Sequence, residues 1–190
     1  MIERLKNPET APTVCYLAHC LLNANAKVDE GARCPGVYSP VIEVLRRKRC
    51  TIRQMPCPEL AFGGARRFWG VREQFDTPLY RQHCRRLAKL VAAVIGQHAA
   101  AGDDLVLLGV DTSPTMGVEF TCSSPTWAGK PDIGDEDDST LVPGDGIFIE
   151  ELKTELAERG LPEPRATGIR HWFVDYDPDE ELQRIGALLR

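Results

Sequence analysis

Four short apolar runs alternate with longer amphipathic segments along this chain of 190 residues. The runs over 13–19, 51–55 and 105–110, and a fourth near 166–173, predict β-strands. The third run is apolar throughout, which is typical of a central strand in a parallel sheet that is covered on both faces. Between the runs, apolar residues recur at helical spacing, so strands and helices alternate.

Prolines and glycines mark the ends of the predicted helices. A proline stands in the first turn of three of them, at Pro40, Pro78 and Pro178, where its missing N–H costs nothing. Gly102 and Gly160 follow the last turns of two helices and supply natural stops. The longest predicted helix therefore lies between Pro78 and Gly102.

The order of elements predicts one α/β domain over 1–190, because it shows neither a repeat nor a clear linker. The expected fold is a doubly wound, Rossmann- or flavodoxin-like sheet of about four parallel strands in the order 2-1-3-4. Residues 1–11 are polar and are expected to form a loose N-terminal arm. Irregular segments are expected over 23–36 and 60–76, and the longest, 117–143, is expected to be a long loop or a lid.

Composition narrows the class of protein. A net charge of -5 with 43% hydrophobic and 27% charged residues is ordinary for a globular protein and argues against bulk binding to nucleic acid. No apolar stretch could span a membrane, and the N-terminus lacks an apolar signal region, so a cytoplasmic protein is expected. Seven cysteines without a Cys-x-x-Cys pair predict reduced thiols and no structural zinc finger. The oligomeric state stays open.

Three of the predicted strands end in turns that carry sulfur. Cys20 follows the first strand, Cys57 the second and Met116 the third. Because the carboxyl ends of parallel strands line one edge of a sheet, these side chains are expected to share a pocket. Thiolates that converge need a cation or a cluster, since uncompensated buried charge is costly. The alternative is that both cysteines are small core side chains.

Polar residues near the same turns are candidates for catalysis. Glu59 lies two residues beyond Cys57, and a carboxylate in a closed pocket can act as an acid or a base. Ser113 and Thr115 flank Pro114 and could orient water or substrate. The alternatives are a capping or surface carboxylate and local turn hydrogen bonds.

A further glycine-rich turn, 144–146, begins a predicted helix and offers backbone N–H groups to an anion. It lacks the Lys-Ser/Thr of a P-loop, and no Gly-x-Gly-x-x-Gly follows the first strand. A nucleotide-binding interpretation is therefore weak.

Four motifs in order resemble a known family. They are Cys-Leu-Leu-Asn at 20–23, Pro-Cys-Pro-Glu at 56–59, Ser-Pro-Thr-Met-Gly-Val at 113–118 and Pro-Gly-Asp-Gly at 143–146. Together they resemble the DUF523 group, which includes the thiouracil desulfidases, and in particular its shorter relatives beginning His-Cys-Leu-Leu-Asn. The resemblance covers roughly 13–160.

The resemblance implies a [4Fe-4S] cluster held by three cysteines, with one iron open to take sulfur from a thiocarbonyl substrate such as a thiolated pyrimidine. Carried over residue by residue, Cys20 and Cys57 are cluster ligands and Glu59 is the acid or base. Thr115 occupies the position of an assisting serine, and Ser113 stands beside it in the same turn.

The chain departs from the family pattern at the third ligand. The family reads Ser-Pro-Ser-Cys-Gly where this chain has Met116, a neutral thioether that is a much poorer iron donor than thiolate. Either Cys122 replaces the missing ligand, or the cluster is labile, or the chemistry has been lost. We take Cys122 as the expected third ligand.

Three functions therefore compete. The first is an iron–sulfur desulfidase. The second is a non-catalytic α/β protein that binds a small molecule and has lost the cluster. The third is a metal-free enzyme with Cys20 or Cys57 as nucleophile, which needs an activating base such as His19.

Overall fold

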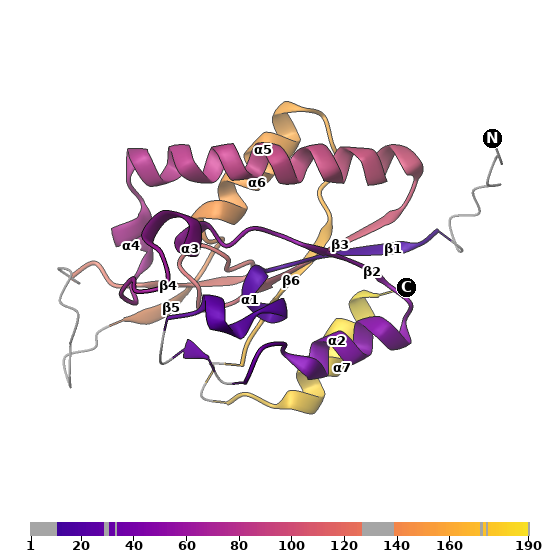
Figure 1. Ribbon diagram of the computed structural model, residues 1–190, viewed down its shortest axis with the longest axis horizontal. Helices are drawn as coiled ribbons and strands as arrows, with labels where there is room; N and C mark the ends of the chain where they lie inside the picture. The colour runs from indigo at the N-terminus through magenta and orange to yellow at the C-terminus, as the bar shows by residue number, and fades with distance from the viewer. Residues whose placement is uncertain are drawn as a thin grey trace.

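The computed structural model describes residues 11–189, except 29, 30, 33, 127–138, 172 and 174. A parallel sheet lies between two pairs of helices (Figure 1). The predicted N-terminal arm falls, apart from residue 11, outside the described residues. The fold is thus the α/β arrangement that the alternating pattern predicts.

Four parallel strands form the main sheet, in the order β2-β1-β3-β6. Their bounds are Thr13–Leu17 for β1, Thr51–Gln54 for β2, Asp104–Val110 for β3 and Arg165–Ile169 for β6. Numbered along the chain within this sheet, the order is 2-1-3-4, which confirms the prediction. The apolar run of β3 occupies the centre, with six of its seven residues buried.

The register of the sheet aligns the ends of its first three strands. Leu17, the last residue of β1, is paired with Gln54 at the end of β2 and with Leu108 near the end of β3. The segments that follow these strands therefore leave the sheet at neighbouring points along one edge.

Four helices cover the sheet. Two of them, α5 (Pro78–Ala101) and α6 (Ile147–Glu158), pack together over one face, and α2 (Ser39–Arg47) and α7 (Pro178–Leu188) pack together over the other (Figure 1). Within the described part of the chain, no helix has both the length and the apolar character needed to cross a membrane.

The helix ends follow the signals in the sequence. The Thr77 hydroxyl accepts a hydrogen bond from the backbone N–H of Tyr80 (3.3 Å) at the start of α5. Gly102 ends that helix with φ of 75°, a left-handed conformation that glycine adopts without strain. Asp177 caps α7 by accepting from the backbone N–H groups of residues 179 and 180.

Short elements occupy the segments expected to be irregular. They are α1 (His19–Leu22), a 3-10 turn η2 (Ala24–Ala26), α3 (Pro58–Gly63), α4 (Arg72–Phe75), and the antiparallel pair β4 (Phe120–Ser123) and β5 (Thr140–Pro143). The expectation of an irregular 60–76 was therefore wrong in part, because elements of four to six residues show no periodicity. In the predicted lid, 127–138 lies outside the described residues.

Candidate functional site

The segments after β1, β2 and β3 meet at the carboxyl edge of the sheet. Cys20 lies in α1, directly after β1. Cys57 caps α3, where its sulfur accepts a hydrogen bond from the backbone N–H of Leu60 at 3.4 Å. Ser113 and Thr115 lie in the turn after β3. The adjacency of three strands thus gathers side chains almost a hundred residues apart in the sequence.

Glu59 is the centre of the polar contacts at this edge. The Thr115 hydroxyl donates to Glu59 Oε1 at 2.6 Å, and the Ser113 hydroxyl lies 3.3 Å from the same oxygen. Arg67 Nε lies 3.3 Å from Oε2, in an ion pair whose side chains are only 9% (Arg67) and 16% (Glu59) exposed. Hydrogen bonds to an ionised acceptor are stronger than neutral ones, so Glu59 is held in one orientation.

The surroundings of Cys20 and Cys57 disfavour the thiolate form of both side chains. Burial raises the pKa of Cys20 to about 11; the Lys27 ammonium acts against this shift, while Cys57 and Glu59 add to it. Burial, followed by the Glu59 charge, also raises the pKa of Cys57. Without a bound cation both groups are therefore protonated near neutral pH, which argues against a metal-free thiolate mechanism.

His19, the base considered for such a mechanism, points to another partner. Its Nδ1 atom lies 2.5 Å from the side-chain nitrogen of Gln54, at the end of β2. Burial lowers the pKa of His19. The ring is thus tied to the end of the neighbouring strand.

Three side chains at this edge were missed by the sequence reasoning. Arg67 comes from the segment after α3 and also donates to the carbonyl oxygen of Ala26 (2.8 Å). The buried Tyr80 hydroxyl lies near Thr115 but makes no hydrogen bond of ordinary geometry within the described structure. Lys27 lies 2.6 Å from His171 Nε2. These residues occupy a surface loop, a buried position of α5 and the residue that follows η2, none of which gives a local signal.

The third sulfur position does not complete a thiolate set. Met116 is 4% exposed and packs in the core, while its backbone N–H donates to Ser113 Oγ at 3.0 Å. Cys122 lies in β4, paired with Leu141 of β5. All seven cysteines fall in the described ranges, and no group of three His, Cys, Asp or Glu side chains there is spaced to hold a metal ion.

The glycine-rich turn before α6 is occupied by protein contacts. The backbone N–H groups of Gly146, Ile147 and Phe148 donate to the carbonyl oxygens of residues 117, 114 and 115. The helix start thus supports the turn that carries Thr115 and has these three donors engaged.

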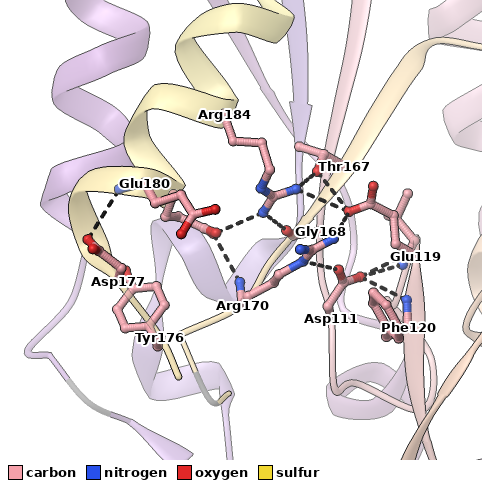
Figure 2. A network of polar contacts seen from close by, with 12 residues as sticks. Asp111, Glu119, Phe120, Thr167, Gly168, Arg170, Tyr176, Asp177, Glu180 and Arg184 are labelled. Carbon is pink, nitrogen blue, oxygen red and sulfur yellow. Dashed lines mark hydrogen bonds and ion pairs between the residues drawn. The ribbon is translucent and has the colours of Figure 1, made fainter. Parts of the chain in front are cut away.

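A second network of polar contacts holds the chain that follows β3 (Figure 2). Asp111 is fully buried, and its Oδ1 accepts from the backbone N–H groups of residues 118, 119 and 120 at 3.0 to 3.3 Å. Arg170 lies 3.3 Å from Asp111 Oδ2 and 2.8 Å from Glu119. Position 168 requires glycine, because a Cβ there would lie 1.9 Å from Asp111 Oδ1.

Removing the Asp111 carboxylate is expected to destabilise the fold. Asp111→Ala leaves three backbone N–H groups without an acceptor and Arg170 without its buried partner, so we expect a loss of about 3–5 kcal/mol in the free energy of unfolding. Urea denaturation of wild type and variant measures this difference in the free energy of unfolding. Glu43→Ala, at an exposed position of α2, is the control and should change stability by less than about 0.5 kcal/mol. Equal midpoints for the two variants would contradict the role of Asp111.

Comparison with curated proteins finds a similar archaeal protein. The chain is 29% identical over 105 residues to an uncharacterized protein, MJ0003, of Methanocaldococcus jannaschii; the match covers 55% of this chain and 67% of the relative. No protein-family model matches the chain. No solved structure matches it either.

Proposed function

We propose that this protein is a desulfidase that removes sulfur from a small thiocarbonyl compound, such as a thiolated pyrimidine. The observation that carries the proposal is the arrangement of Glu59, held by Thr115 and Arg67, at the edge where Cys20 and Cys57 lie. The order of sulfur motifs, which resembles that of the thiouracil desulfidases, supports the same conclusion.

An iron–sulfur cluster fits this donor set only in part. Cys57 lies near enough to Cys20 to raise the pKa of that thiol, and the two cysteines could supply two thiolates once a cation lowers their pKa values. Met116 supplies a neutral thioether at the third position, and no third thiol, imidazole or carboxylate of the described chain completes the group. The cluster, where bound, would supply an iron that takes up the substrate's sulfur.

The protein's own residues can manage the protons of the reaction. Hydrolysis of a thiocarbonyl adds the oxygen of water to carbon, breaks the carbon–sulfur bond and releases both protons of water with sulfur as hydrogen sulfide. In this proposal Glu59 takes a proton from the attacking water and returns it to the departing sulfur. Thr115 and Ser113 hold Oε1 in place, and Arg67 holds Oε2, so the carboxylate is already positioned when the substrate binds.

One observation favours a second function. Met116 removes a thiolate that a stable cluster would need, which favours a protein that binds a small molecule without turnover. A metal-free cysteine enzyme has less support, because burial raises the pKa values of Cys20 and Cys57.

The test is anaerobic turnover. Protein reconstituted with iron and sulfide, then freed of excess reagents, is expected to convert 2-thiouracil to uracil with one sulfide released per uracil formed. Cys57→Ser is the matched control, since serine still caps α3 but gives no thiolate, and it should lose both cofactor and turnover. Protein that takes up no iron under these conditions and releases no sulfide from thiolated bases or nucleosides would favour the binding protein instead.

A further inference from the structure

Tyr80 carries a hydroxyl that the fold buries without giving it a hydrogen bond. The residue is 2% exposed, and its oxygen finds no hydrogen-bond partner among the described residues. A buried polar group without a partner costs free energy, and the hydroxyl of a buried tyrosine usually has one. Native proteins keep such a group where a bound molecule satisfies it or where it serves catalysis. The Tyr80 hydroxyl therefore points to a ligand that does not belong to the chain.

Neighbouring rings hold the Tyr80 side chain in place. The Phe62 ring of α3 lies edge-on to it and the Phe75 ring of α4 lies tilted against it, each with ring centroids 5.0 Å apart. Such aromatic pairs add to the free energy of packing beyond burial alone. Because rings from two other helices pack against it, the tyrosine ring keeps its hydroxyl in the interior.

The start of α5 is fastened beside Glu59. His83, three residues after Tyr80 on this helix, has its Nε2 atom 3.0 Å from the carbonyl oxygen of Pro58, the residue that precedes Glu59. Burial, followed by the charge of Glu59, raises the pKa of Tyr80 above its ordinary value. The hydroxyl thus lies near the carboxylate and keeps its proton at neutral pH, so it can donate a hydrogen bond.

Glu59 has an acceptor site that the chain does not use. An ionised carboxylate offers about four lone-pair sites. Three hydrogen bonds from the described residues reach Glu59: Thr115 (2.6 Å) and Ser113 (3.3 Å) donate to Oε1, and Arg67 (3.3 Å) donates to Oε2. One site on Oε2 is therefore left for a donor. A molecule between this oxygen and the Tyr80 hydroxyl has to donate to the first and accept from the second, as a buried water can.

We propose that Tyr80 and Glu59 together bind the water molecule that attacks the carbon of the thiocarbonyl group. The water donates one hydrogen to Glu59 Oε2, which is the proton that Glu59 removes, and accepts a hydrogen bond from Tyr80. Tyr80 transfers no proton itself. Its O–H stays hydrogen-bonded to the same oxygen atom while that oxygen passes from water to the product. This inference rests on the proposed function and assigns a second residue to the water that the reaction consumes.

The bound water can be observed without turnover. In a crystal structure of the wild-type protein, an ordered water is expected within about 3.2 Å of both Tyr80 Oη and Glu59 Oε2. Tyr80→Phe keeps the ring and its aromatic contacts but removes the donor, so its crystal structure should lack this water. A wild-type structure without the water, or a variant structure that keeps it in place, would overturn the proposal whether or not the protein is a desulfidase.

Kinetics test whether this water is the reactant. In reconstituted protein, Tyr80→Phe is expected to lower kcat for 2-thiouracil by about 10²-fold, the loss that follows removal of one preorganised donor, and to leave KM within about twofold of wild type. Tyr16→Phe is the matched control and should match wild type. Tyr16 is also 2% exposed with a hydroxyl that has no partner in the described structure, but its ring packs on His98 near the other end of α5.

The two measurements separate this inference from the proposed function. An unchanged kcat in Tyr80→Phe would overturn the part of Tyr80 in the reaction while leaving the desulfidase intact. A wild-type protein that shows the ordered water but turns over no thiocarbonyl compound would refute the desulfidase, and with it the role of the water as reactant.

Discussion

Glu59→Gln is expected to lower the turnover of a thiocarbonyl substrate by about 10²-fold or more, while iron and sulfide content stay at the wild-type level. Glutamine has nearly the same shape and can still accept the Thr115 hydroxyl hydrogen at the position of Oε1. It cannot take up a proton, which is the step assigned to Glu59. The measurement is the initial rate of uracil formation from 2-thiouracil, normalised to iron.

A control carboxylate separates chemistry from general charge effects. Glu158→Gln removes the same charge from an exposed position near the end of α6 and should leave the rate unchanged. Loss of iron in Glu59→Gln would mean that the variant disturbs Cys57, two residues away, and the rate per bound iron then becomes the quantity to compare. A rate per iron equal to wild type would rule out the proton-transfer role.

The sheet and its main helices could be predicted because their signals are local. The continuous apolar run of β3 indicated a strand buried on both faces, and Pro78 and Gly102 marked the two ends of α5. Strand order followed from general rules of α/β topology. The strand order places the carboxyl ends of β1, β2 and β3 side by side. Cys20, Cys57 and Ser113 follow these ends, so they could be expected to lie near one another.

The polar surroundings of Glu59 could not be predicted in the same way. Arg67 is positioned by contacts with residues 26, 59 and 64. It reaches Glu59 only because the segment after α3 folds back toward that helix. Tyr80 looks in the sequence like any aromatic residue of a buried helix stripe. Such partners are fixed by three-dimensional packing between elements, and no periodic pattern records them.

Met116→Cys is expected to raise the iron and sulfide bound per protein several-fold after anaerobic reconstitution. Two hydrogen bonds hold the turn that carries residue 116. The Met116 N–H donates to Ser113 Oγ, and the Met116 carbonyl oxygen accepts from the Val110 N–H at 2.9 Å. A thiol placed there extends from the same fixed backbone as the thioether, in a turn that shares Ser113 with the Glu59 network. It would restore the third thiolate that the family pattern has and this chain lacks.

Two further variants decide what the wild-type protein uses. Cys122→Ser is expected to leave iron content unchanged, because Cys122 lies in β4 and forms no ligand group with Cys20 and Cys57 in the described structure. Val44→Cys adds a thiol on the buried face of α2. It is the control for iron that any additional buried cysteine would bind. If Cys122→Ser instead loses most of its iron and Met116→Cys gains none, then β4 must move to bring Cys122 to the cluster. If no variant binds iron, the two thiols are core side chains, and a protein that binds a small molecule without turnover replaces the desulfidase as the proposed function.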